Sequence, residues 1–468
     1  MDIALASRNI GPAAIVAGRW RDIRASDLTG IDQGTAIPPN PAVPNPFDAV
    51  KHPTRPRLLA VLGPGLITGA SDDDPSGIAT YSQAGAQFGY GLAWVMLFSW
   101  PLMCAIQEVA ARIGRVTGRG IAGNLKLHYP AGVVYGLVSM LLVANTINLG
   151  ADLGAMAAAV KLVVGGPQLL YVALFAVLSV VLETFVRYSR YVSVLKWLTL
   201  SLFAYVGVAL VVPIPWLTVA HQLVVPHISL DAGYLTVVVA ILGTTISPYL
   251  FFWQAEEEVE DVKERQGAKP LSRAPEQAAK EFGRIRWDTY IGMGLSNAVA
   301  LFIILTTAAT LNAHGITDIQ TSAQAAEALR PVAGPFVFLV FALGIVGTGL
   351  LALPVLASSS AYAVGETFGQ HVGLARTVGR AKTFYATIAI ATAVGAVLNF
   401  TPLDPVKALF WSAVINGVVA VPIMAMMLLL SSRRDVMGDF TLPRAMKLVG
   451  WLATAVMTVA AIGMFATM

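Results

Sequence analysis

Apolar stretches long enough to cross a lipid bilayer recur along the chain from Leu58 to its C-terminal end. A helix needs roughly 20 apolar residues to cross about 30 Å of hydrocarbon, and eleven segments approach or exceed that length. They span residues 58–82, 90–111, 133–158, 166–186, 192–213, 233–255, 287–311, 333–357, 382–400, 405–430 and 446–467. The pattern predicts an all-α polytopic membrane protein whose transmembrane domain covers residues 58–468.

The first 57 residues differ from the rest of the chain. They carry scattered charges and a cluster of prolines, and they contain no apolar segment of helical period. No uninterrupted apolar core is followed by a cleavage site, so no signal peptide is expected. Residues 1–57 are predicted to form a disordered cytoplasmic tail.

The composition excludes an ordinary soluble protein. Hydrophobic residues make up 56% of the 468 residues and charged residues 12%, whereas soluble proteins carry about 25% charged residues.

The placement of basic residues predicts the orientation in the membrane. With a cytoplasmic N-terminus, 28 of the 31 Lys and Arg residues fall on cytoplasmic segments, and only Lys161, Arg330 and Lys407 fall outside. We expect an integral plasma (inner) membrane protein with its C-terminus outside. The net charge of +4 then reports orientation, and no nucleic-acid partner is needed to explain it.

Several classes of function are disfavoured by what the sequence lacks. Its single cysteine, Cys104, allows neither a disulfide framework nor a cysteine metal cluster. There is no HExxH, no GxSxG and no phosphate-cradling loop, so a membrane enzyme is not expected. No resident cofactor is expected either. The lipid bilayer is the required partner, and a single chain suffices, although the oligomeric state is left open.

Two apolar segments are interrupted by polar residues and helix breakers. In the first, the carboxylates of Asp72, Asp73 and Asp74 precede Pro75, Ser76 and Gly77. Proline and glycine disfavour a continuous helix, and a carboxylate within the membrane is costly and normally serves an ion, a proton or a substrate. An outer loop between two short helices is the alternative. It is disfavoured because residues 58–71 are too few to span and no basic residue flanks the run.

The sixth segment is interrupted in the same way, by Gly243, Thr244, Thr245, Ser247 and Pro248. Pro75 and Pro248 are 173 residues apart, each in the first helix of a set of five. Paired interruptions of this kind are typical of inverted-repeat transporters with a site at the bilayer midplane. We expect repeats over about 58–213 and 233–430, with an extra helix at 446–467. Unwound carbonyls and half-helix ends would give a cation its oxygen ligands.

The sequence around these breaks resembles the NRAMP family of divalent-metal transporters, from about Arg57 to the C-terminus. The resemblance is densest in GPGLITGASDDDPSGIATYSQAGAQFGYGLAWV and VAARIGRVTGRGIAGNLKLHYP. Family members carry Gly-Pro-Gly, Asp-Pro-Gly-Asn, Ala-Gly-Ala-Gln-Phe-Gly-Tyr and an Ala-Arg-x-Gly-x-x-Thr-Gly-Arg stretch. The resemblance implies a LeuT-like fold of eleven or twelve helices, with two inverted repeats of five and with helices 1 and 6 broken.

The resemblance also implies a ligand set, carried over one residue at a time. The metal-binding Asp of the family falls on Asp74, and its Asn ligand falls on Gly77. The family's Met in the sixth helix is Ser247, and the backbone carbonyl ligands would come from Ser71 and Thr244. A polar ligand in the tenth helix falls near Asn416, for which helix packing is the alternative.

Other positions are implied in the pathway or in coupling. The family's Asp and Glu in the third helix fall on Leu149 and Asp152, and its histidines after the sixth-helix proline are replaced by Tyr249 and Gln254. Asp73 is expected to line the pathway. Asp152 either faces the vestibule or pairs with a polar neighbour. The segment from Glu256 to Trp287 is interpreted as a charged cytoplasmic loop, whose alternating acids and bases indicate a solvated helix with i,i+4 pairs. A regulatory metal site on its acidic start is the alternative.

These departures point to a hard cation as the transported substrate. Loss of the thioether, with carboxylate, hydroxyl and carbonyl oxygens retained, disfavours soft transition metals. Loss of the Asn and Met side chains is also expected to widen the cavity, which would suit a partly hydrated Mg²⁺. An NRAMP-related branch of magnesium transporters lacks the same ligands. We expect secondary transport of Mg²⁺, and also of Mn²⁺, into the cytoplasm without proton coupling. The alternatives are a proton-coupled Mn²⁺/Fe²⁺ symporter and a Na⁺-coupled LeuT-fold carrier of an organic solute.

Overall fold

The computed structural model describes residues 68–69, 71–186, 199–265, 267–374, 376–401 and 404–468. The predicted tail at residues 1–57 and the start of the first segment fall outside these ranges. Within them are eight helices long and apolar enough to cross a membrane, or nine when the bent pair at Leu200–Val211 and Trp216–Val224 counts as one span.

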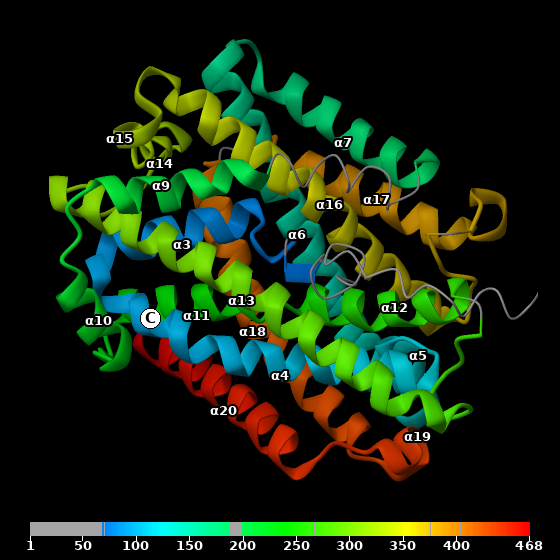
Figure 1. Cartoon of the computed structure of the whole chain (residues 1–468). Helices are drawn as coiled ribbons and strands as arrows, with labels where there is room; N and C mark the ends of the chain where they lie inside the picture. The colour runs from blue at the N-terminus through cyan, green and yellow to red at the C-terminus, as the bar shows by residue number, and fades with distance from the viewer. Residues whose placement is uncertain (1–67, 70, 187–198, 266, 375, 402–403) are drawn as a thin grey trace, which may run out of the picture. The chain divides into compact units, whose positions relative to one another are not determined.

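The long helices coincide with the predicted segments (Figure 1). The first set comprises α3 (Pro75–Phe88), α4 (Ala93–Thr117), α6 (Ala131–Val164), α7 (Gln168–Phe185) and α9 (Phe203–Val211). The second set comprises α11 (Ala232–Thr245) with α12 (Pro248–Glu264), α13 (Ala278–Thr310), α16 (Val337–Phe368), α17 (Lys382–Leu398) and α18 (Pro405–Ser431), and α20 (Arg444–Thr467) follows. Five short helices were not predicted: α5 (Ile121–His128), α10 (Trp216–Val224), α14 (Ser322–Glu327), α15 (Arg330–Ala333) and α19 (Arg434–Met437).

The helix contacts have the exchange symmetry of two inverted repeats. The broken helix of each set packs on the second helix of the other set, so that α3 contacts α13 and α12 contacts α4. The third helices of the two sets, α6 and α16, pack against each other. Helices α11 and α18 approach closely at Gly243, where a Cβ would lie 2.1 Å from the Ala413 carbonyl oxygen. The glycine in the sixth-segment break is therefore required by this packing.

Both predicted breaks are present, and each helix restarts at a proline. Residues 71–72 are helical, Asp73 and Asp74 are not, and α3 then begins at Pro75. The second break lies at Ile246 and Ser247, between the end of α11 and Pro248 at the start of α12. Proline is favoured at a first helical position because its missing N–H would have no intrahelical partner there. The two breaks therefore expose two helix N-termini inside the protein.

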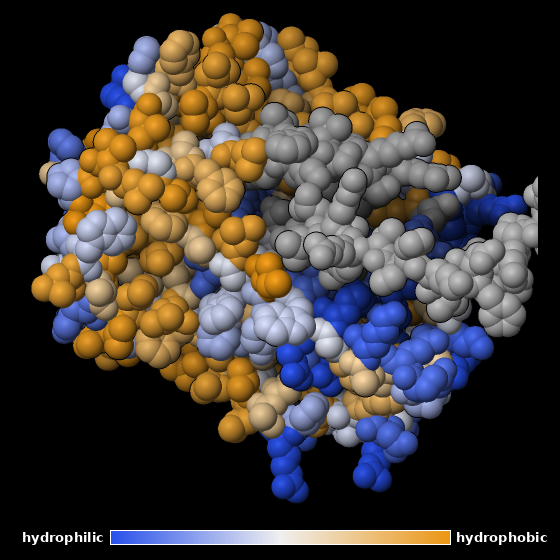
Figure 2. All heavy atoms as spheres, viewed as in Figure 1, coloured by the Kyte–Doolittle hydropathy of each residue, from blue (hydrophilic) through white to orange (hydrophobic). Residues whose placement is uncertain are grey.

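The surface separates apolar from polar regions. Figure 2 shows hydrophobic residues over the region of α3, α9 and α13, while hydrophilic residues gather near α5 and the end of α12. The polar end joins segments that the sequence places on one side of the membrane. Leu271 N–H donates to the Arg115 carbonyl (3.1 Å), and Gly120 N–H donates to the Glu366 carboxylate (2.8 Å). Arg433, in another basic segment expected on the cytoplasmic side, also reaches this end, with its Nη1 3.5 Å from the His128 carbonyl oxygen.

The prediction of a solvated surface from Glu256 to Trp287 is wrong, although much of this segment is helical as expected. Helix α12 continues to Glu264 and α13 begins at Ala278, and residues 265–277 lie between them. Glu256 and Glu258 are 1% and 0% exposed. The run of charges was assigned to solvent, whereas Glu258 faces Arg115 on α4 and Arg284 on α13, and Glu256 lies beside Gly120.

Candidate functional site

Asp74 lies at the first break and caps the helix that follows it. Its Oδ1 accepts hydrogen bonds from the Gly77 N–H (2.7 Å) and from the Ser76 hydroxyl (2.7 Å). A carboxylate at a helix N-terminus is stabilised by the unpaired N–H groups and by the helix dipole. The side chain is 1% exposed. One oxygen of Asp74 is thus used by the helix, and the other, Oδ2, faces α6.

An asparagine on α6 joins Asp74 to a second carboxylate. The Asn148 amide nitrogen lies 3.1 Å from Asp74 Oδ2 and 3.3 Å from Asp152 Oδ2. Asn416 on α18 approaches the same group, with its Nδ2 3.5 Å from Asn148 Oδ1. All four side chains are no more than 1% exposed. The structure therefore brings Asp74, Asp152 and Asn416 together, with Asn148 at the centre.

Asn148 was missed by the sequence interpretation. The third-helix alignment placed the family's acidic positions on Leu149 and Asp152, and Leu149 is a buried apolar residue of the core. The available signal was an asparagine inside an otherwise apolar helix, one turn before Asp152. Asn145, three residues earlier, has a different role. It donates to Ser359 (3.0 Å) and Ser360 (2.9 Å) on α16, so the serine run packs helices together as expected.

The other two carboxylates of the break face α13. The Ser296 hydroxyl lies 2.6 Å from Asp72 Oδ2 and 3.1 Å from Asp73 Oδ1. A hydroxyl has one proton and donates fully to only one acceptor at a time. Asp72 Oδ1 is buried and has no hydrogen-bond partner in the described part of the chain. Asp73, predicted in the pathway, is 5% exposed.

The two backbone carbonyls implied as ligands are both hydrogen-bonded to hydroxyl groups. Tyr249 donates to the Ser71 carbonyl (3.1 Å), which connects α12 to the first break. The Ser247 hydroxyl donates to the carbonyls of Gly243 (2.6 Å) and Thr244 (2.8 Å), within its own segment. In the described part of the chain, Ser247 forms no hydrogen bond with Asp74. These hydroxyls hold the exposed carbonyls in place.

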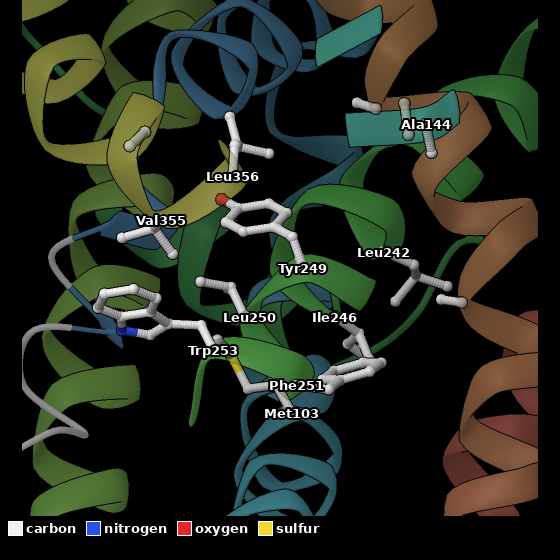
Figure 3. Close-up of a cluster of buried hydrophobic side chains, with 14 of the residues drawn as sticks. Met103, Ala144, Leu242, Ile246, Tyr249, Leu250, Phe251, Trp253, Val355 and Leu356 are labelled. Atoms are coloured by element: carbon white, nitrogen blue, oxygen red, sulfur yellow. The ribbon is translucent and has the colours of Figure 1, made fainter. Parts of the chain in front are cut away.

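The start of α12 is surrounded by apolar side chains. Figure 3 shows Tyr249 and Leu250 among Ile246, Val355 and Leu356, all buried. Gln254, one turn further along α12, accepts a hydrogen bond from Thr68 (2.6 Å) across the first break. Tyr249 and Gln254 thus tie the two broken segments together. Among the described residues, their side-chain hydrogen bonds go to Ser71 and Thr68 beside the carboxylate cluster, and none goes to Asp74.

The expected widening of the site at Gly77 is not found. A Cβ on Gly77 would lie 3.1 Å from Thr244 Oγ1, 3.2 Å from the Tyr81 ring and 3.3 Å from the Asp72 carbonyl oxygen. The volume of the missing Asn side chain is therefore filled by Thr244 and Tyr81. Gly77 therefore adds no room for the water molecules of a hydrated ion. Any preference for one metal over another has to come from the ligand atoms.

The electrostatic character of the site is uniformly negative. Among the described residues, none of the ion pairs involves Asp72, Asp73, Asp74 or Asp152. The Oδ1 atoms of Asp152 and Asn416 are buried and have no hydrogen-bond partner there. A buried carboxylate without a compensating charge is strongly disfavoured, so the site attracts a cation. The unpartnered atoms of Asp72, Asp152 and Asn416 are all oxygens, which can bind a cation.

A metal ion at this site would need ligands other than carboxylates. Within the described ranges, no three His, Cys, Asp or Glu side chains meet as a metal-binding group. An ion at Asp74 would therefore combine carboxylate oxygens with amide, hydroxyl or carbonyl oxygens. Such mixed oxygen sets suit hard cations.

Comparison with known proteins identifies the family of this chain. Residues 65–467 match the Nramp family, described as natural resistance-associated macrophage protein-like. Divalent metal cation transporter MntH of Burkholderia ambifaria is 28% identical over 411 residues, covering 85% of this chain and 87% of that protein. The transporter of the same name from Klebsiella pneumoniae strain 342 is 28% identical over 410 residues, covering 85% and 92%.

Solved structures share the fold. A manganese transporter of Eremococcus coleocola has a TM-score of 0.66 at 18% identity, covering 93% of this chain and 90% of that chain. Mhp1, a nucleobase-cation-symport-1 family transporter in a closed conformation, has a TM-score of 0.54 at 13% identity, covering 87% and 92%. The predicted LeuT-like fold with broken first and sixth helices is confirmed. Because the family match covers most of its length, the chain belongs to the Nramp family.

Proposed function

We propose that this protein carries divalent metal cations across the membrane into the cytoplasm. The observation that carries the proposal is a buried cluster of oxygen ligands, Asp74, Asn148, Asp152 and Asn416, with no Lys or Arg ion pair in the described residues. The two carboxylates offer two negative charges, which a divalent ion balances. The protein is a multi-pass membrane transporter of the Nramp/MntH kind, and it is not an enzyme.

The preferred substrate is Mg²⁺, with Mn²⁺ also accepted. Carboxylate, amide and carbonyl oxygens are the ligands of hard cations, and Ser247 offers a hydroxyl where a thioether would favour softer metals. Mg²⁺ usually keeps several of its waters, so few protein ligands suffice. Ser71, Gly77, Thr244 and Ser247 remain proposed contributors around Asp74.

A proton-coupled Mn²⁺ transporter is the second candidate. Its support is Asp152, which is 0% exposed and shares Asn148 with Asp74, so that a titratable group lies beside the ion site. Two relatives are named divalent metal cation transporters, and a structural neighbour is a manganese transporter. We favour uncoupled transport. The membrane potential alone supplies about 4.6 kcal/mol for a divalent ion at 100 mV, from about 2.3 kcal/mol per charge.

A Na⁺-coupled carrier of an organic solute fits the site poorly. Such a carrier presents half-helix N-termini to a substrate carboxylate, whereas the N-terminus of α3 is already occupied by the Asp74 side chain. The neighbouring carboxylates of Asp72 and Asp73 would repel an anionic substrate. In the proposed orientation, the N-terminus and the end of the protein bearing α5 and α19 face the cytoplasm, and the C-terminus lies outside.

The test is metal uptake by the purified protein in proteoliposomes, with Mg²⁺, Mn²⁺, Ca²⁺ and Cd²⁺ compared. Asp74→Ala is expected to abolish uptake. Asp404→Ala is a matched control, because Asp404 caps α18 before Pro405 as Asp74 caps α3 before Pro75. Uptake that survives in a well-folded Asp74→Ala protein, or that is lost equally in Asp404→Ala, would contradict the assignment of Asp74 to the ion.

A further inference from the structure

The side chain of Asn148 lies between two carboxylates. Its amide nitrogen lies within hydrogen-bonding distance of Asp74 Oδ2 (3.1 Å) and Asp152 Oδ2 (3.3 Å). An NH₂ group has two protons and can donate one to each acceptor. The two acids come from different elements, the first break and α6, so the amide joins them across the interface.

The hydrogen-bond network fixes which end of the amide faces the acids. An ionised carboxylate only accepts hydrogen bonds, so with both acids ionised the NH₂ end of Asn148 faces Asp74 and Asp152. The Asn148 Oδ1 atom then lies 3.5 Å from the Asn416 Nδ2 atom. Asn416 Oδ1 is buried without a hydrogen-bond partner in the described residues. The cluster thus contains two amides whose orientations are set by the two carboxylates.

A cation bound between Asp74 and Asp152 would favour the opposite orientation of the Asn148 amide. A metal ion binds the lone pairs of both carboxylates and repels the positive end of the amide dipole, so the NH₂ group could not remain between them. Rotation of the terminal amide by a half turn exchanges Nδ2 for Oδ1 with little change in shape. The Asn148 oxygen would then face the ion as a third, neutral ligand, and its nitrogen would face Asn416.

We propose that Asn148 acts as an amide switch for the transported ion: its NH₂ group bridges Asp74 and Asp152 while the site is empty, and its carbonyl oxygen binds the ion when the site fills. This inference rests on the proposed function and names a specificity-determining residue of that site. Two carboxylates and one neutral amide give a total charge of minus two. A divalent ion is therefore balanced, whereas a monovalent ion leaves a buried charge uncompensated.

Asn145 on the same helix provides the contrast. Its amide nitrogen faces the neutral hydroxyls of Ser359 and Ser360 and the Leu356 carbonyl. No carboxylate accepts from it, so an arriving cation would not change its orientation. Asn145 is equally buried, at 0% exposed, and it serves as the matched control for loss of a buried amide from α6.

The experiment measures Mg²⁺ and Mn²⁺ affinity by calorimetry, and melting temperature with and without Mg²⁺, on the full chain in nanodiscs. Asn148→Leu removes both the donor and the ligand. We expect affinity to fall at least tenfold, about the lower range for lost metal-site contacts, and the metal-free protein to melt at a lower temperature. Asn145→Leu is expected to lower the melting temperature while keeping the affinity of the wild type.

Asn148→Asp gives a second, opposite readout. It adds a third carboxylate and removes the bridging donor, so the metal-free protein is destabilised while divalent ions bind more tightly. The rise in melting temperature on adding Mg²⁺ should therefore exceed that of the wild type. If both Asn148 variants bind Mg²⁺ and Mn²⁺ as the wild type does, the switch is wrong and the proposed function stands. If the wild type itself neither binds nor transports these ions, the proposed function fails first.

Discussion

Two groups of acidic residues inside this protein differ in whether arginine side chains pair with them. At the first break and on α6, Asp72, Asp73, Asp74 and Asp152 are at most 5% exposed, and their hydrogen bonds in the described part of the chain come from neutral groups. At the end of α12, acidic side chains of α12 and α13 meet arginines instead: Glu258, Asp261 and Glu281 contact Arg115, Arg265 and Arg284. The second group has as many arginines as acids, and the first has none among the described ion pairs.

The arginine network holds three helices together. Arg115 on α4 is 0% exposed and lies 2.7 Å from Asp261 on α12 and 2.9 Å from Glu281 on α13. Arg284 on α13 contacts Glu258 (2.5 Å) and Glu281 (3.0 Å). Here the protein supplies its own cations, and the charges serve structure. At the breaks it supplies none, which leaves the carboxylates to a cation from outside. An acidic residue with an arginine partner holds helices together, whereas one without such a partner is available to bind a cation.

The largest expected effect is on stability, from removing the central arginine of the network. Arg115→Met removes the fully buried cation that Asp261 and Glu281 share and leaves them only the more exposed Arg265 and Arg284. Breaking a fully buried pair costs about 3–5 kcal/mol, which is the upper bound for this loss of stability. Thermal or SDS-induced unfolding of the purified protein measures this loss. Lys263→Met is the control, because Lys263 forms an exposed pair with Glu260 (3.3 Å) worth only about 0–1 kcal/mol. Equal unfolding of both variants would mean that the network does not clamp the helices.

At the first break, removing a charge is expected to raise stability instead of lowering it. Asp72 has one buried oxygen without a partner, so Asp72→Asn removes an uncompensated charge while keeping the shape of the side chain. Stability of the metal-free protein should rise by about 1–3 kcal/mol, the usual cost of an unsatisfied buried group. The measurement is unfolding in EDTA, with Asp261→Asn, which should lower stability, beside it. If both substitutions destabilise, the two groups of acids do not differ as described.

This contrast also explains what the sequence could and could not predict. The breaks were predicted because proline, glycine and carboxylates act locally, and Asp74 is found where Asp-Pro placed it. The Glu108–Arg112 pair, four residues apart on one helix, is present at 2.7 Å. The Arg115 network was missed because Arg115 is far in sequence from its acidic partners, 146 residues in the case of Asp261. A run of charges in sequence looks the same whether it faces solvent or a distant arginine.

The ligand set was predicted only in part, for the same reason. Asn148 reaches Asp74 across 74 residues of sequence, and no local rule separates it from Asn145, which packs on serines. The space at Gly77 was misjudged because the side chain that fills it, Tyr81, lies one turn further along α3. Composition can show that a ligand is missing, but only packing shows what takes its place.

A smaller effect is expected on selectivity at the second break. The Ser247 hydroxyl donates to the Gly243 and Thr244 carbonyls, so Ser247→Met frees these oxygens and adds a soft thioether. The ratio of Cd²⁺ to Mg²⁺ affinity, measured by calorimetry, should rise about tenfold. Adding Gly77→Asn restores the family's second ligand. That Asn must displace Thr244 and Tyr81 by a few tenths of an ångström, so a partial gain is expected. An unchanged ratio in both variants would remove the ligand-softness explanation.

The smallest effect is expected on proton movement, and it tests whether Asp152 belongs with the acids that bind the ion or with a coupling mechanism. A coupled carrier needs a group near the ion that takes up and releases a proton in each cycle. Tyr249, with a reference pKa of about 10 for its side-chain type, is a poor acceptor at neutral pH, and Asp152 is the other candidate beside Asp74. Asp152 and Asp74 are both hydrogen-bonded to Asn148. We therefore expect Asp152 to help bind the ion and not to carry a proton in each cycle. Proteoliposomes loaded with a pH dye, given Mg²⁺ under a valinomycin-set negative potential, should show metal uptake without acidification of the lumen. Acidification that depends on the metal and disappears in Asp152→Asn, but persists in Asp404→Asn, would identify a proton-coupled transporter and place Asp152 in a third class of buried acid.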